Sequence, residues 1–526
     1  MGLVYLFETT ARDASANPVP VRLSTGEGYN HPSAPGYFEP AIAAAALSVA
    51  VQRAAFTASA FGAGDVQFGD VTAANTGALD AYEALGYGQA ATLKVGDEAA
   101  PYGSFTTLVS ARCRDVVPAS AALAFVWQGR LRELDEPASP ATFAGTNSGT
   151  TGLEGTANDI GGKRKPRAWG KLRNIEPVLL NASTRIYGWN FDKTGDRLPT
   201  HSLEAVRFRG SLWTFGTDYA TAALLAASTP TNGTYNTCLA ESLILMGGSV
   251  PLNGGPVTLD ATIEADAADR TAPALLNRLL LDAGVAPADI IAGDIATLTA
   301  QAPYEAGIYL FGDDPYRALC DRLSASVAAV YIPDRLGRYR IRRIAAPSGV
   351  PVARFKRFDL LSAAASDEYD LLACEPVVGE PWVPAKEISV RYAPNFTPLR
   401  AADVAAAVSD DDRAFLTQAW RITAPQTLPD IAAQYGDAEV RRFDTLLSQE
   451  ADALAMRAVF AALFGAKRRF WQASVSLPPS LAAALDIGDT VRLTQPRYGM
   501  AAGKDFVVHG IRTFDSTDTA ELKLFG

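Results

Sequence analysis

Short apolar segments separated by glycine and proline turns fill the first 135 residues. The six segments are LVYLFET, VPVRLST, GDVQFGDVTAAN, ATLKVGD, FTTLVSARCRDV and ALAFVWQG. Regularly spaced strands with turn signals between them predict a small β-barrel-like or sandwich domain over residues 1–135. The alanine-rich run at residues 41–56 leaves a helix open there, because alanine has a high helix propensity.

The next segment, residues 136–260, is rich in Gly, Thr, Asn and Pro, and its most loop-like stretch is PASPATFAGTNSGTTGLEGT. A flexible linker could have this composition. However, PVLLN, RIYGWN and AVRFRG follow, and these segments have the composition of strands. We therefore expect an ordered β-rich segment with long loops over residues 136–260.

Helical periodicity begins at Thr271. In TAPALLNRLLLDAG, a threonine cap and an early proline precede apolar residues spaced three and four apart, and Gly284 ends the predicted helix. A second helix is predicted from Asp314 and leads into two strands joined by a tight turn. The pattern predicts an α/β helix-hairpin domain over residues 261–345.

The second strand of that hairpin, RYRIRRI, places Tyr339 and Ile341 on one face and Arg338, Arg340 and Arg342 on the other. Three arginines in a row of this kind could bind a phosphate. The period of two favours a solvated or partner-facing strand surface instead.

Residues 438–464 show the longest helical pattern, with one apolar stripe and Gly465 at its end. The period then changes to two, and strands are predicted in DTVRLTQP, DFVVHGIRTF and TAELKLFG. The residues that this alternation places in the core are Trp471, Ala473, Val475 and Leu477. We expect a long helix and a C-terminal β-barrel-like domain over residues 438–526, and a β-rich connecting domain over residues 346–437.

Together these patterns predict a β-rich α+β multidomain fold, with β-barrel or sandwich domains at both ends and α/β domains inserted between them. A length of 526 residues agrees with several domains, and 48% hydrophobic with 20% charged residues is an ordinary globular composition. The chain begins without a basic leader and apolar run, and no stretch approaches about 20 apolar residues, so we expect neither a secretion signal nor a membrane segment.

Basic residues gather in EGTANDIGGKRKPRAWGKLRNIEP, residues 154–177. A phosphate-binding loop is excluded, because its first glycine position holds Ala157 and the residue after Lys163 is Arg164, which has no hydroxyl for a metal. A nucleic-acid site is disfavoured by the formal charge of −10. We therefore predict a protein interface, with no nucleic-acid binding. The residues assigned to it are Lys163, Arg164, Lys165, Arg167 and Lys171.

Motifs for enzyme chemistry are lacking. The four cysteines, Cys113, Cys238, Cys320 and Cys374, form no C-x-x-C pair, and buried free thiols are expected, although distant cysteines could still converge on a metal or cluster. No H-E-x-x-H or G-x-S-x-G motif occurs. We expect no cofactor, no metal and no catalytic residue, while a pair of catalytic carboxylates stays open because its spacing depends on the fold.

The segment GLEGTANDIGGKRKPRAWGKLRNIEPVLLN resembles one in tail proteins of tailed bacteriophages. It shares with them a Gly-Leu-x-Gly opening, a Gly-Lys-x-Lys-Pro core and an Asn-Ile-x-Pro ending. The stretches LDIGDTVRLTQPRYGMAAGKDFVVHGIRTF, VYIPDRLGRYRI and GDVQFGDVTAANTGALDAYEALGYG are similar to further parts of baseplate hub or tail-tip proteins of long-tailed phages and of phage-derived gene transfer particles.

This resemblance implies a structural hub in the virion tail tip, assembled in the host cytoplasm. The hub would connect the tail tube to distal tip and host-recognition proteins and surround a central channel. It would form a homotrimer whose two barrel-like domains per subunit give pseudo-sixfold symmetry, with the tail tube, distal tail and tip or fibre proteins as partners.

Three other functions stay open. The chain could be a hexameric distal tail adaptor, which would share the N-terminal β domain and the basic segment. It could be a tail-borne glycoside hydrolase that uses carboxylates. It could also be a carbohydrate-binding β protein if Trp189 and Trp213 are exposed, although single tryptophans in β segments usually lie in the core.

Overall fold

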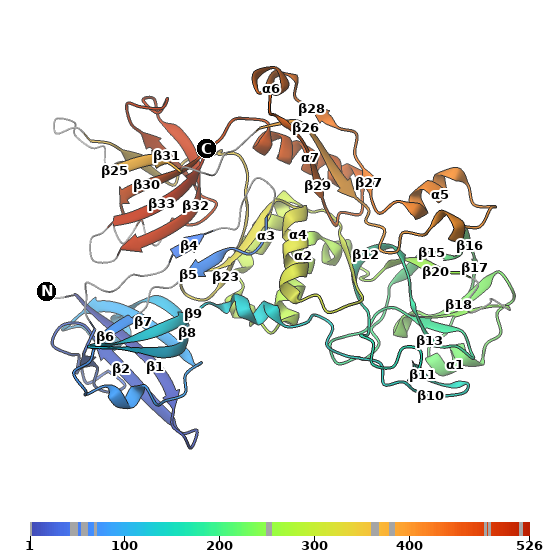
Figure 1. The fold of residues 1–526 in the computed structure, drawn as a ribbon, viewed down its shortest axis with the longest axis horizontal. Helices are drawn as coiled ribbons and strands as arrows, with labels where there is room; N and C mark the ends of the chain where they lie inside the picture. The colour runs from blue at the N-terminus through green and yellow to red at the C-terminus, as the bar shows by residue number, and fades with distance from the viewer. Residues whose placement is uncertain are drawn as a thin grey trace.

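The computed structural model describes residues 3–42, 51–53, 61–67, 71–248, 255–358, 368–377, 384–477, 481, 485–514 and 519–526. It contains several β-sheets, with the longer helices gathered between them (Figure 1). The predicted class, a β-rich α+β multidomain fold, is confirmed. Short 3-10 helices are η2 (Asp80–Tyr82), η3 (Tyr102–Ser104), η4 (Arg130–Asp135), η5 (Leu239–Glu241), η6 (Ala267–Arg270), η7 (Pro287–Asp289) and η8 (Ala401–Asp403).

The N-terminal β domain is a seven-stranded sheet in the order β3-β2-β1-β7-β8-β9-β6. A bridge between Ile42 and Ala73 joins the two ends of the sheet, so the domain is barrel-like. In its core the Phe7 ring lies 5.0 Å from that of Phe125 and 5.6 Å from that of Trp127. The strands are β1 (Leu3–Arg12), β2 (Pro18–Ser24), β3 (Glu39–Pro40), β6 (Val71–Ala74), β7 (Ala90–Asp97), β8 (Thr106–Ala119) and β9 (Ala122–Gln128).

Six strands near the C-terminus close into a barrel in the order β31-β24-β25-β30-β33-β32, with β32 pairing back to β31. Two of them come from the stretch expected to form a separate connecting domain. The expected core alternation is confirmed, because Trp471, Val475 and Leu477 are buried. The strands are β24 (Ala353–Lys356), β25 (Glu368–Pro376), β30 (Phe470–Ser476), β31 (Thr490–Thr494), β32 (Lys504–Phe514) and β33 (Thr519–Phe525).

A two-stranded arm from the N-terminal part of the chain extends this barrel (Figure 1). Strand β4 (Val51–Arg53) pairs antiparallel with the end of β32, and β5 (Asp65–Gln67) pairs with β4. Main-chain hydrogen bonds thus tie the two terminal β domains together. Of the alanine-rich run, residues 41–42 and 51–53 are described and 51–53 form a strand; the rest of the run lies outside the described residues.

The middle β module contains two five-stranded sheets, β16-β15-β20-β12-β21 and β13-β14-β19-β18-β17, and the hairpin β10-β11. Trp189 lies fully buried in this module, where its Nε1 donates a hydrogen bond of 2.9 Å to Thr200 Oγ1, so it is not a surface aromatic. Trp213 is partly buried. The elements are β10 (Thr146–Ser148), β11 (Thr151–Thr156), β12 (Arg167–Ile175), β13 (Val178–Asn181), β14 (Ile186–Gly188), β15 (Ser202–Phe208), β16 (Ser211–Leu212), β17 (Thr214–Asp218), α1 (Ala222–Ala227), β18 (Thr234–Cys238), β19 (Leu243–Met246), β20 (Val257–Thr262) and β21 (Gly307–Leu310).

The helix-hairpin module follows the predicted pattern. Helix α2 begins after Thr271, whose hydroxyl accepts a hydrogen bond from the Ala274 N–H at 3.4 Å. The arginine face of β23 is not a free surface, because Arg340 donates to the Asp294 carboxylate on α3 at 2.8 Å and also pairs with Asp486 beside the C-terminal barrel. The elements are α2 (Ala272–Asp282), α3 (Ala292–Gln301), α4 (Tyr316–Ser326), β22 (Ala329–Pro333) and β23 (Tyr339–Arg343).

The remaining module is built on β26, which pairs in parallel with β29 on one side and antiparallel with β27 and β28 on the other. The helix predicted over residues 438–464 begins only at Glu450, because 439–444 pair with β26 as a strand. The apolar stripe still packs together, and the Phe443 ring lies 4.0 Å from Phe460. The elements are β26 (Ala385–Tyr392), α5 (Asp410–Thr417), β27 (Arg421–Ile422), β28 (Gln426–Thr427), α6 (Pro429–Gln434), β29 (Glu439–Asp444) and α7 (Glu450–Phe464). Of the helices in the described ranges, none is long and apolar enough to cross a bilayer.

Candidate assembly site at the basic motif

The basic motif, residues 154–177, runs from strand β11 through a glycine-containing turn into strand β12. Gly155 has a φ of +66°, and a Cβ at this position would lie 2.0 Å from Ile160 Cγ1. Both the backbone conformation and the lack of space therefore require glycine. The Asp159 carboxylate closes the turn, since its Oδ1 accepts hydrogen bonds of 2.5 Å from the N–H groups of Thr156 and Ile160.

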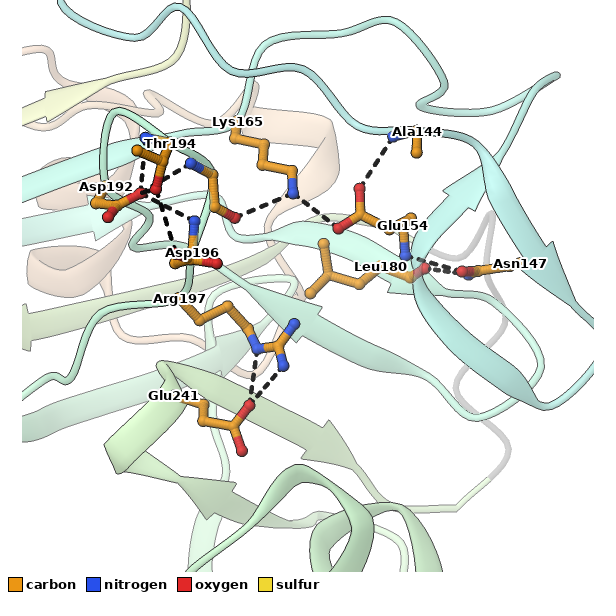
Figure 2. Close-up of polar contacts among 11 residues, drawn as sticks. Ala144, Asn147, Glu154, Lys165, Leu180, Asp192, Thr194, Asp196, Arg197 and Glu241 are labelled. Carbon is orange, nitrogen blue, oxygen red and sulfur yellow. Dashed lines mark hydrogen bonds and ion pairs between the residues drawn. The ribbon is translucent and has the colours of Figure 1, made fainter.

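Lys165 is an internal residue of this motif (Figure 2). Its Nζ lies 2.7 Å from Glu154 Oε1 and donates to the Gly195 carbonyl at 3.1 Å. The ammonium group also lies 5.4 Å from the ring centres of Phe143 and Phe191. A lysine that is 7% exposed thus has both a counter-ion and aromatic neighbours, which is how a buried ammonium group is stabilised.

Glu154, which pairs with Lys165 and lies on the β10-β11 hairpin, is itself held by hydrogen bonds (Figure 2). Glu154 Oε2 accepts from the Ala144 N–H at 2.9 Å, and the Glu154 N–H donates to Asn147 Oδ1 at 2.8 Å. Asn147 Nδ2 in turn donates to the Leu180 carbonyl at 2.6 Å. The network therefore joins the β10-β11 hairpin to strand β13.

The loop that presents the Gly195 carbonyl is ordered by Asp192 (Figure 2). Asp192 Oδ1 accepts from the N–H groups of Thr194, Gly195 and Asp196 at 2.8, 2.8 and 2.9 Å. Partial desolvation raises the pKa of Asp192, but these hydrogen bonds and that from the Thr194 hydroxyl outweigh it, so the pKa lies below its ordinary value.

The same loop ends in an ion pair. Arg197 Nε and Nη2 lie 2.9 and 2.6 Å from Glu241 Oε2, while Glu241 Oε1 accepts from the Ala222 N–H at the start of α1. Desolvation raises the pKa of Glu241, but the hydrogen bonds from Ala222 and Arg197 and the positive charge of Arg197 lower it below 4.5 overall. The ionised carboxylate therefore stabilises this part of the fold.

Arg167 is buried more deeply than Lys165 and joins the middle β module to the helix-hairpin module. Its Nη1 donates to the Ala138 carbonyl at 2.7 Å and to the Tyr316 hydroxyl oxygen at 3.0 Å, and its Nη2 donates to Asp282 Oδ2 at 2.8 Å. The guanidinium carbon lies 4.6 Å from the centre of the Trp169 ring. Strand β12 is thus tied to helices α2 and α4.

The five predicted interface residues therefore do not form one exposed patch. Lys165 and Arg167 are 7% and 4% exposed, and for them the expected surface position is wrong, because acidic and carbonyl partners of the same chain surround them. Lys163 is exposed, Arg164 pairs with the exposed Asp313 at 2.5 Å, and Lys171 is partly buried on β12. For these three residues the interface role stays a prediction.

Sequence reasoning missed the last anchor of the motif, Asn174. This residue has a φ of +50°, and its N–H donates to Asp260 Oδ1 at 2.8 Å. Its Nδ2 donates to Asn395 Oδ1 at 2.9 Å and to the Thr397 carbonyl at 2.8 Å, which joins the middle module to the loop after β26. The asparagine of the Asn-Ile-x-Pro ending was the available signal, but its side-chain partners Asn395 and Thr397 lie more than 200 residues away.

Cys113, Cys238 and Cys320 are buried free thiols as expected, and Cys374 is partly buried. Burial raises the pKa of Cys113 to about 12 and that of Cys374 to about 11, so both thiols are protonated at neutral pH. Within the described residues, no group of three His, Cys, Asp or Glu side chains is arranged to hold a metal ion.

No protein-family model and no curated protein matches the chain. In fold it is similar to the 43 kDa tail protein of prophage MuSo2 from Shewanella oneidensis, with 9% identity, a TM-score of 0.42 and 99% of this chain and 98% of that chain covered. It is also similar to a tail protein from Neisseria meningitidis (11% identity, TM-score 0.28, 53% and 78% covered). A prophage tail protein from Listeria monocytogenes aligns with 12% identity, a TM-score of 0.25 and 52% and 72% covered. All three of these structures are described as tail proteins.

Proposed function

We propose that the chain is a structural component of a phage tail tip or baseplate, the hub that joins the tail tube to the distal tip and host-recognition proteins around a central channel. The resemblance of residues 152–181 to tail proteins supports this role. The contacts of two of its residues are consistent with a structural role, because Arg167 and Asn174 join the middle module to other modules of the chain.

The pairing of β4 with β32 is the observation that carries the proposal. It places Arg53 opposite Gly510 and Val51 opposite Arg512, and so fastens the N-terminal β domain to the C-terminal barrel. Both domains lie on the same side of the molecule, with the other modules extending away from them (Figure 1). Three such subunits would provide six barrel-like domains, which is the number a pseudo-sixfold ring beneath a tube needs.

In this proposal the chain has no chemistry of its own and acts in the virion. Its oligomer is a closed trimer, and its partners are other tail proteins. Lys163, which is exposed, and Arg164, which is partly buried and pairs with Asp313, would face an acidic surface on a neighbouring subunit and set its register.

Native mass spectrometry of the purified full chain tests the proposal. The expected species is a trimer of about 167 kDa, three times the 55.6 kDa of one chain. A hexamer would favour the distal adaptor instead. A monomer that cleaves polysaccharides would overturn the structural role and favour a carboxylate hydrolase.

A further inference from the structure

A groove of about 700 Å³ opens where the two ends of the basic motif meet. Its walls come from the turn before β12, the connection from β12 to β13, the end of β21, residues 255–256 before β20 and the loop after β26. A groove of this volume is in the range of small-ligand sites. Its walls are held in place, because Asn174 binds the Thr397 carbonyl and the Tyr309 hydroxyl donates to the Glu176 carbonyl at 2.8 Å.

The groove has an exposed aromatic wall. Phe311 is 51% exposed, although large apolar side chains usually lie in a core. Beside it, the rings of Tyr309 and Phe396 lie 6.2 Å apart, nearly perpendicular to one another. A ring face that is open to solvent can pack against the aliphatic C–H groups of a ligand.

The groove also holds two opposite charges that are not paired with each other. Lys163 and Glu176 both line it, and no ion pair or side-chain hydrogen bond involves either of them within the described residues. Desolvation raises the pKa of Glu176. An ammonium group supplies donors and a carboxylate supplies acceptors, so the two side chains together suit a ligand with many hydroxyl groups.

We infer that this groove binds a short, neutral oligosaccharide, whose C–H face packs on Phe311 and whose hydroxyl groups bind Lys163 and Glu176. The third charged residue of the lining, Asp314, is already paired with Arg322 at 2.5 Å. The two free charges cancel, so a neutral ligand leaves no net charge buried, whereas an anionic ligand would face Glu176. This inference does not rest on the tail assignment, because it is argued from the groove; Lys163 is the one residue that it shares with the proposed subunit interface.

A printed array of neutral and acidic oligosaccharides, probed with the full chain, tests the inference. We expect neutral glycans to bind, and the strongest binder is then titrated by calorimetry. Phe311→Ala should weaken its affinity about tenfold and Glu176→Gln about threefold, as loss of one aromatic contact and one charged acceptor implies.

Phe215→Ala is the matched control, because Phe215 is 53% exposed on β17 and does not line the groove. It should leave the affinity unchanged, and all variants should keep the melting temperature of the natural chain. Three results would each overturn the inference: no neutral glycan binds, Phe311→Ala binds as tightly as the natural chain, or decaproline displaces the glycan with higher affinity, which would assign the groove to a peptide.

Discussion

Arg167 donates a hydrogen bond of 2.8 Å to the carboxylate of Asp282 and so joins strand β12 to the end of helix α2. The two residues are 115 positions apart in the chain. A basic residue that looks like part of a surface patch in the sequence is therefore an internal connector. Lys165 is also an internal residue. The basic motif therefore has an internal part, Lys165 and Arg167, and an external part, Lys163 and Arg164.

The first prediction concerns the internal part. Arg167→Ser should lower the local free energy of unfolding of β12 and α2 by about 2–4 kcal/mol, because buried partners lose their donor and Asp282 loses its counter-ion. Native-state hydrogen exchange of the amides in both elements measures this change. Lys163→Ser, at an exposed position in the same motif, is the control and should change it by less than about 0.5 kcal/mol. Equal effects of the two substitutions would contradict the internal role of Arg167.

The second prediction concerns the external part. The double substitution of Lys163 and Arg164 by Ser should weaken self-association of the full chain at low salt and leave its fold intact. Exposed charges are screened over about 8 Å at physiological ionic strength, so natural and variant chains should converge as salt is added. Sedimentation velocity over a range of salt concentrations measures the association. A variant that associates like the natural chain at every salt concentration would remove these residues from the interface.

The third prediction is a pH dependence of the loop that contains Asp192 and Arg197. Because the folded-state pKa of Glu241 lies below its ordinary value of 4.5, its stabilising effect is fully present above pH 4.5 and is lost as the pH falls through the folded-state pKa. Asp192 has a lowered pKa and acts in the same direction. The protection of this loop's amides against hydrogen exchange, relative to their intrinsic exchange rates, should therefore decrease as the pH falls.

The control for that experiment is a pair of glutamine variants. Glu241→Gln should reduce the acid-dependent part of the exchange, while Glu83→Gln, at an exposed position of the N-terminal domain, should leave it unchanged. An identical pH profile in natural and Glu241→Gln chains would show that the ion pair with Arg197 does not stabilise the loop.

The fourth prediction separates backbone strain from lack of space at two glycines, one in the turn between β10 and β11 and one in the basic motif. Gly149 and Gly155 have φ values of +60° and +66°, but nothing lies within 4 Å of a Cβ added at Gly149, whereas Ile160 lies 2.0 Å from one added at Gly155. Gly149→Ala should cost about 1 kcal/mol from strain alone, and Gly155→Ala at least about 3 kcal/mol. Thermal melting of both variants measures the difference. Equal losses of stability would contradict the steric role of Gly155.

Local patterns in the sequence were sufficient to predict several structural elements. Thr271 caps α2 as its position before Ala and Pro predicts, and the period of two places Trp471 and Val475 in the barrel core. The stretch 438–464 shows the limit of such patterns. Its apolar spacing fits one helix, yet residues 439–444 gain main-chain partners on β26, a distant strand that periodicity does not reveal.

The candidate site was predictable only in part for the same reason. The sequence identified the basic motif but not which of its residues are buried. The counter-ion of Lys165, Glu154, lies on β11, and that of Arg167, Asp282, lies at the end of α2, far away in the chain. Likewise, β25 pairs with β30 across about one hundred residues. Such pairings depend on the global fold, so local sequence predicted a barrel-like C-terminal domain but neither its closure by β24 and β25 nor the groove.

Cryo-electron microscopy of the particle that carries this chain tests the central claim most directly. A structural hub predicts three copies in a closed ring at the tail tip, with the N-terminal β domain and the C-terminal barrel of each copy alternating around the channel. The β4-β32 pairing should be visible in every copy. A single copy per tail, or terminal β domains that lie apart and outside a ring, would contradict the proposal.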